Sequence, residues 1–185
     1  MSDQLWASAT THPFLDAVRG GTLTDEAFDR WLCQDAIFVA DLLTFQARLL
    51  ARAPRAAQQT IVGGCAALVA ELDWFEAKAH ERGIDLAQPP LPATLAYRKL
   101  LQGLDREPYD AAVTALWVIE RVYLLAWTHA HSGTSRFREY SEHWSTPEFV
   151  HYVDALTALA APEDNAALVD TVLSLEVDFW EMAGA

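Results

Sequence analysis

The chain has 185 residues, 52% of them hydrophobic and 21% charged, which is a composition typical of a globular protein. Its 13 basic and 26 acidic residues give a net charge of -13 at pH 7, which disfavours nucleic acid and leaves no basic run for an anionic membrane. We therefore expect one domain over residues 1–185, with no nucleic-acid partner and no membrane association.

The start of the chain and the cysteines predict a cytoplasmic protein. Residues 1–14 lack the charged region and apolar run of a signal peptide. No stretch reaches about 18 uninterrupted apolar residues, so a transmembrane helix is not expected. Cys33 and Cys65 both lie in helical patterns, as buried free thiols of a reducing compartment do.

The first half of the chain reads as four helices. A short helix ends at Gly20, and Thr24 can cap a second helix that runs to about Arg52. A third covers about residues 55–82 and ends at a glycine. After the proline-rich residues 84–92, a fourth helix follows over 93–101.

The second half continues the helical period. Residues 108–131 are apolar nearly all round, as in a central helix. A shorter helix covers residues 136–144, and Ser145 with Glu148 forms a capping box for the next. Pro162 opens the last helix. The pattern predicts an all-α fold, a compact bundle of about eight helices.

Three acidic residues lie on apolar stripes of long helices. Asp35 is in line with Leu32 and Val39, and Glu120 and Glu176 occupy similar positions. Burying an unpaired carboxylate costs several kcal/mol. We expect the three to converge on one polar pocket, with aromatic walls drawn from Tyr97, Tyr123, Trp127, Trp144 and Trp180.

A structural role is the alternative for each of these carboxylates. Glu120 is followed by Arg121, and Arg98 or Lys99 is also available to neutralise a buried charge. Taken singly, each carboxylate fits either reading; the three together favour a site.

A metal site and a cysteine nucleophile are not expected. Glu148 and His151 have the Glu-x-x-His spacing of di-iron bundles, which need the motif on two helices, and the sequence holds one copy. His129 and His131 are two apart on a helix and diverge. Cys33 and Cys65 have no histidine base nearby in sequence and fit small core residues.

Four segments resemble the TenA (thiaminase II) family in the same order along nearly the whole chain. They are "HPFLDAVRGGTLTDEAFDRWLCQDAIFV" (12–39), "LPATLAYRKLL" (91–101), "STPEFVHYV" (145–153) and "LEVDFWEMA" (175–183).

The resemblance implies a haem-oxygenase-like helical fold, hydrolysis of an aminopyrimidine in thiamine salvage, and no cofactor. It assigns pyrimidine binding to Asp35, proton transfer to Glu176 and a place in the pocket wall to Tyr97. It also implies a homo-oligomer, either a dimer or a tetramer.

The chain resembles most the branch of the family that lacks a catalytic cysteine. Thr114 and Ala115 stand where a cysteine would be expected, and Glu120 is the glutamate of this branch. Phe38 and Trp144 stand where the cysteine branch has tyrosines.

We therefore predict a cofactor-free hydrolase that acts on an aminopyrimidine-type thiamine breakdown product. Glu120 and Glu176 would share acid and base duties, with water as the attacking group. The alternatives are a non-catalytic small-molecule binding protein on the same fold, or a diverged member with another amine or amide substrate. The expected substrate-binding residues are Asp35, Tyr97, Phe38, Tyr123, Trp144 and Trp180.

Overall fold

The computed structural model describes residues 3–184, which form nine α-helices and one short 3-10 helix. The elements are α1 (Asp3–Thr10), α2 (Pro13–Gly20), α3 (Asp25–Arg52), α4 (Arg55–Arg82), α5 (Pro92–Gly103), η1 (Leu104–Arg106), α6 (Tyr109–Ala130), α7 (Arg138–His143), α8 (Pro147–Thr157) and α9 (Ala166–Gly184). The described residues contain no strand, so the predicted all-α fold is confirmed.

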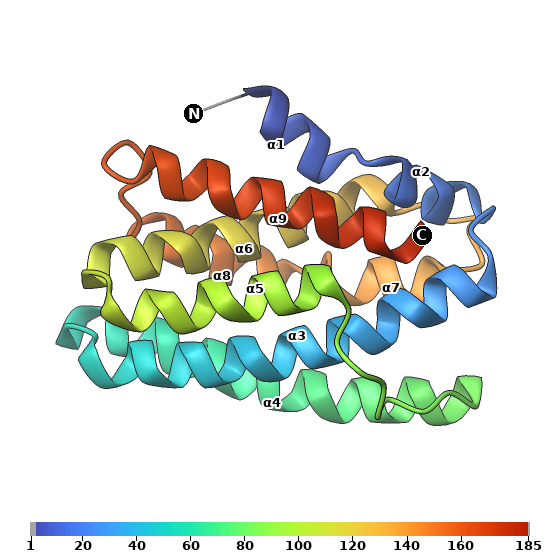
Figure 1. The fold of residues 1–185 in the computed structure, drawn as a ribbon, viewed down its shortest axis with the longest axis horizontal. Coiled ribbons are helices and arrows are strands. Elements are labelled where there is room, and N and C mark those ends of the chain that lie inside the picture. Colours follow the sequence, from blue (N-terminus) through green and yellow to red (C-terminus); the bar gives the residue numbers. More distant parts are fainter. Residues whose placement is uncertain (1–2, 185) are drawn as a thin grey trace.

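The helices form an elongated bundle around α6 (Figure 1). The long helices α3 and α4 run antiparallel along one side, and α9 lies on the other side next to α1. Helix α5 fits between α3 and α9. Helix α6 packs against α8, α9 and α2, so it has protein on most of its surface.

Helix α6 is long and apolar enough to cross a membrane by length and composition. Most of that apolar stretch is buried inside the bundle, including Ala112, Val118 and Ala126, which are wholly buried. Its hydrophobicity is therefore that of a core helix surrounded by other helices.

Local sequence signals determine several helix ends. The Thr24 hydroxyl accepts a hydrogen bond from the Ala27 amide at 3.2 Å and caps α3, as predicted. Gly83 ends α4 with a φ of 67°, the left-handed conformation that favours glycine. These signals set the start of α3 and the end of α4, the two helices that flank the site.

Two expected boundaries were wrong, and one helix was not predicted. The short helix that ends at Gly20, as expected, is α2; a separate helix, α1, precedes it, because Pro13 disfavours helical backbone at His12, whose ψ is 149°. Thr146, not Ser145, caps α8, and it accepts from the Phe149 amide at 3.2 Å. The last helix begins at Ala166 instead of Pro162, because residues 162–165 form a turn.

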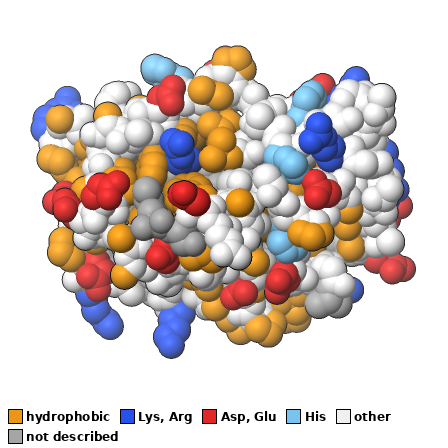
Figure 2. All heavy atoms as spheres, turned by 90° about the horizontal axis from the view of Figure 1, so that it is seen from above, with side chains coloured by type: hydrophobic (Ala, Val, Ile, Leu, Met, Phe, Trp, Pro, Cys, Tyr) orange, Lys and Arg blue, Asp and Glu red, His pale blue; other side chains and the backbone are white. Residues whose placement is uncertain are grey.

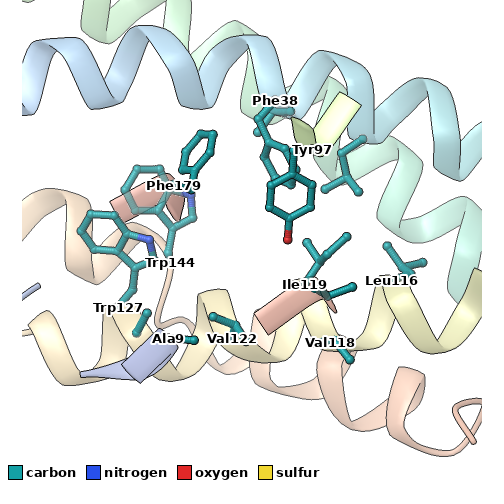
Figure 3. Close-up of a cluster of buried hydrophobic side chains, with 14 of the residues drawn as sticks. Ala9, Phe38, Tyr97, Leu116, Val118, Ile119, Val122, Trp127, Trp144 and Phe179 are labelled. Carbon is teal, nitrogen blue, oxygen red and sulfur yellow. The ribbon is translucent and has the colours of Figure 1, made fainter. Parts of the chain in front are cut away.

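The core is rich in aromatic rings. In Figure 3, Phe38 and Tyr97 lie together, and the Tyr97 hydroxyl points toward the helix that carries Ile119. Trp127 and Trp144 lie on the other side of this cluster, with ring centroids 4.5 Å apart. This aromatic core surrounds the buried carboxylates described below.

Charged side chains are spread over the surface. On the face seen in Figure 2, lysine and arginine side chains are scattered among acidic and uncharged ones. That face therefore shows no continuous basic patch.

Candidate functional site

A cavity of about 630 Å³ opens between α3, α4, α6 and α8 and the residues that precede α8. Four of the residues predicted to form the site line it: Phe38, Glu120, Tyr123 and Trp144. Its size is within the range of small-molecule sites. The walls are mostly apolar, so the carboxyl groups in them are among the few polar groups that a ligand could contact.

The four other predicted residues lie behind this wall. Asp35, Tyr97, Glu176 and Trp180 are not among the residues that line the cavity, and all are nearly or fully buried. They contact the wall directly: the Tyr97 ring lies 4.6 Å from that of Phe38, and Trp180 stacks on Tyr123 at 6.4 Å. The predicted residues therefore form one connected group in two layers.

Asp35 occupies the apolar stripe of α3 and is completely buried. One of its oxygens, Oδ2, accepts a hydrogen bond from the Tyr123 hydroxyl, while Oδ1 has no hydrogen-bond partner in the described part of the chain. Loss of hydration on burial raises the pKa of Asp35 well above its usual value, opposed by the Tyr123 hydrogen bond and increased by the negative charges of Glu71 and Glu176. The environment of Asp35 thus favours its protonated form more than an exposed position would.

Glu176 forms a second carboxyl–phenol pair. The Tyr97 hydroxyl donates to its Oε1 at 2.5 Å, in a fully buried position. Burial raises the pKa of Glu176 to about 8, and the hydrogen bond from Tyr97 opposes this change. Because the phenol donates to it, Glu176 is prepared to carry a negative charge.

Glu120 has a different environment. Within residues 3–184, no hydrogen bond or ion pair reaches its carboxyl group. Loss of hydration on burial, with the negative charges of Glu71 and Glu176, raises the pKa of Glu120 to about 8. Its carboxyl group therefore faces the cavity as an acid with a free O–H.

The arginines considered as structural partners of Glu120 bind elsewhere. The guanidinium of Arg121 lies over the rings of Trp6 and Trp117, 5.8 and 5.5 Å from their centroids. Arg98 pairs with Asp41 at 2.8 Å. A structural ion pair with either arginine thus does not account for the burial of Glu120.

Glu71 is a member of the cavity wall that the sequence interpretation missed. Its two oxygens accept from the indole N–H of Trp144 at 2.5 Å and lie 2.8 Å from Nε2 of His143. The residue sits three positions after Leu68 and four before Phe75, both buried. The signal that singled out Asp35, a carboxylate on an apolar stripe, was therefore present for Glu71 too.

The cysteines lie outside the cavity wall. Cys33 is buried, and its thiol lies 3.6 Å from the carbonyl oxygen of Asp85; burial raises its pKa. Burial also raises the pKa of Cys65. Neither environment favours a thiolate nucleophile. Among residues 3–184, no group of three or more His, Cys, Asp and Glu side chains is arranged to hold a metal ion.

The site holds two carboxyl groups whose pKa values are both raised to about 8 but whose hydrogen-bond partners differ. Glu176 is supported by a phenol that favours its charged form, while Glu120 has no such donor. Pairs of this kind can divide base and acid duties.

Comparisons with known proteins identify a family and several relatives of this chain. Residues 2–184 match the sequence profile of the TENA/THI-4/PQQC family. A relative from Glycine max, described as a probable bifunctional TENA-E protein, is 32% identical over an alignment of 202 positions that covers 97% of this chain and 88% of the relative.

Solved structures share the fold. A TenA homologue from Pyrococcus furiosus matches with a TM-score of 0.91 and 27% identity over 98% of this chain and 95% of that chain. A TenA homologue from P. horikoshii matches with a TM-score of 0.88 and 21% identity over 98% of this chain and 93% of that chain.

Proposed function

Because the chain belongs to the TENA/THI-4/PQQC family, we propose that it is a hydrolase of an aminopyrimidine-type thiamine breakdown product, with a carboxylate acid/base mechanism and no cofactor. The observation that carries the proposal is the unpaired Oδ1 of Asp35, a buried acceptor without a partner among the described residues, directly behind the aromatic wall of the cavity. Buried acceptors of this kind usually have a partner, which a ligand would supply here.

Recognition of the substrate would use the protonated form of Asp35, which its raised pKa favours. A protonated carboxyl group presents one O–H donor and one carbonyl acceptor. The edge of an aminopyrimidine presents the complementary pair, a ring nitrogen acceptor and an amino donor. Asp35 lies one helical turn before Phe38 on the stripe of α3 that reaches the cavity, so a ligand reaches Oδ1 once Phe38 or Tyr123 moves aside.

Chemistry would use the two glutamates with water as the attacking group. Glu176, which accepts a hydrogen bond from Tyr97, takes a proton from water as the water oxygen bonds to the carbon that carries the amine. Glu120 gives its proton to the amine nitrogen as the carbon–nitrogen bond breaks, and ammonia leaves. The sum is addition of water across the bond, with no oxidant or reductant.

Ammonia release on incubation with 4-amino-5-aminomethyl-2-methylpyrimidine tests this proposal. We expect turnover with the unmodified protein and a strong loss in Glu176→Gln. A rise in melting temperature with the pyrimidine but no ammonia would instead support a binding protein. Release from other amines or amides alone would support a diverged substrate.

A further inference from the structure

Glu71 is held in place at the cavity wall more firmly than an exposed carboxylate. Its side chain is 17% exposed, and each oxygen has its own partner, the Trp144 indole N–H at 2.5 Å and His143 Nε2 at 2.8 Å. The His143 ring in turn stacks on Trp74 at 4.1 Å, with 6° between the planes. Both contacts hold the carboxyl group at a fixed position.

The cavity supplies little positive charge to offset Glu71. Among the described residues that line it, none is a lysine or arginine, while Glu71, Glu120 and Glu148 contribute carboxyl groups. His143 is the basic side chain that contacts Glu71. Negative charge on Glu71 therefore acts across a mostly apolar space on its neighbours.

Glu120 is the neighbour with no hydrogen-bond partner of its own. The ionisable groups that act on it or respond to it come from four helices: Glu71 on α4, Tyr97 on α5, Tyr152 on α8 and Glu176 on α9. All four are acidic, so none of them stabilises a charged Glu120; the basic side chains of the cavity wall are His143, which contacts Glu71, and His151.

We propose that Glu71 is a positioning residue of the site, whose fixed negative charge in the shared cavity adds to burial in holding the proton on the Glu120 carboxyl group, so that Glu120 acts as the acid. The effect on turnover rests on the proposed function. The relation between the two carboxyl groups does not, because it follows from their shared cavity and their different partners.

The site contains its own internal control. The charge of Glu71 contributes to the raised pKa of Glu120, whereas the raised pKa of Glu176 comes from burial, opposed by Tyr97. Removing the charge of Glu71 is thus expected to affect one glutamate and spare the other.

Infrared difference titration of the buried carboxyl C=O bands tests the proposal without substrate. Glu120→Gln and Glu176→Gln assign the two bands. In Glu71→Gln we expect the Glu120 midpoint to fall by roughly one pH unit or more, while the Glu176 midpoint stays. Glu76→Gln, an exposed carboxylate on the same helix, is the matched control and leaves both midpoints unchanged.

An unchanged Glu120 midpoint in Glu71→Gln overturns the proposal, as does an equal fall of both midpoints. Glu71→Ser is a second neutral variant, used if the glutamine variant does not fold, and Glu71→Asp should restore a raised midpoint. If the pyrimidine is hydrolysed, the alkaline limb of the rate profile shifts to lower pH with the Glu120 midpoint. If it is not, the proposed function fails while the titration still decides the role of Glu71.

Discussion

The hydroxyl of Tyr123 donates to Oδ2 of Asp35, and the other oxygen of the same carboxyl group has no partner among residues 3–184. A buried acceptor left unpaired costs about 1–3 kcal/mol. Such a cost is tolerated where a bound ligand makes the missing hydrogen bond.

Asp35→Asn should therefore reduce affinity for an aminopyrimidine by about tenfold or more, since a contact of this kind is worth about 1.4 kcal/mol or more. The amide keeps the shape of the carboxyl group but presents its donors and acceptor differently, so the fold should persist. Calorimetric titration with the pyrimidine measures the change. Asp41→Asn, on the same helix and paired with Arg98 away from the cavity wall, is the control. Unchanged affinity in a destabilised Asp35→Asn would make Asp35 a structural residue.

The free energy of unfolding of Glu120→Gln, relative to that of the unmodified protein, should increase as pH rises. The pKa of Glu120 is about 8 in the folded state and near 4.5 in the unfolded state. Between these values the unfolded chain releases the proton and the folded protein keeps it, so the free energy of unfolding falls with rising pH. The glutamine variant has no such proton to retain, so its free energy of unfolding does not fall for this reason. Relative to the unmodified protein, its free energy of unfolding should rise by on the order of a few kcal/mol from pH 5 to pH 8. Urea denaturation at both pH values measures this, and a pH-independent difference would contradict the raised pKa.

Glu120→Gln and Glu176→Gln should each lower turnover by roughly 100-fold or more if they act as acid and base. The double variant should fall little further, because groups that act as a unit are not additive. Ammonia release at saturating pyrimidine gives the rates, and circular dichroism checks the folds. Full turnover in Glu120→Gln would show that Glu120 is not the general acid of the reaction.

Gly64→Ala should destabilise the protein by about 1–3 kcal/mol. A Cβ at this position would overlap the side chains of Gln46 and Tyr152, which meet at 3.0 Å beside the glycine. The neighbouring Gly63→Ala is the control, because its Cβ would meet no atom within 4 Å, and removing a helical glycine should stabilise by about 0.5–1 kcal/mol. Thermal unfolding of both variants compares them. Equal effects would show that the Gln46 and Tyr152 side chains yield easily.

Replacing Cys33 and Cys65 together by alanine should leave most turnover intact. Neither thiol lines the cavity, and burial raises the pKa of both. The measurement is ammonia release with and without prior treatment by a thiol reagent. Rapid inactivation that the pyrimidine prevents would point to a thiol in the reaction.

The sequence predicted the long helices well because their signals are local. The cap at Thr24 and the glycine at Gly83 determine where α3 begins and α4 ends with little help from packing. The end regions were predicted less well. The choice between Ser145 and Thr146 as cap of α8 depends on where neighbouring segments place the chain, and the apolar pattern alone does not decide it.

The burial of three carboxyl groups was predictable from the sequence, but Glu71 was missed and the two layers of residues were not foreseen. A carboxylate on an apolar stripe marks burial, and this correctly indicated that Asp35, Glu120 and Glu176 are buried. Which of them reaches the cavity depends on long-range contacts, such as those of Tyr123 with Asp35 and of Tyr97 with Glu176. Periodicity within one helix carries no information about such pairs.

The packing of Trp144 gives the protein a built-in optical reporter. This indole lines the cavity, and its ring centroid lies 4.5 Å from that of Trp127, 5.0 Å from Trp74 and 5.5 Å from Trp31. Indoles this close share their electronic excitation, which produces strong near-ultraviolet circular dichroism and energy transfer between rings. Filling the cavity against one member of the group should alter the signal of them all, so that ligand occupancy becomes visible without any attached dye.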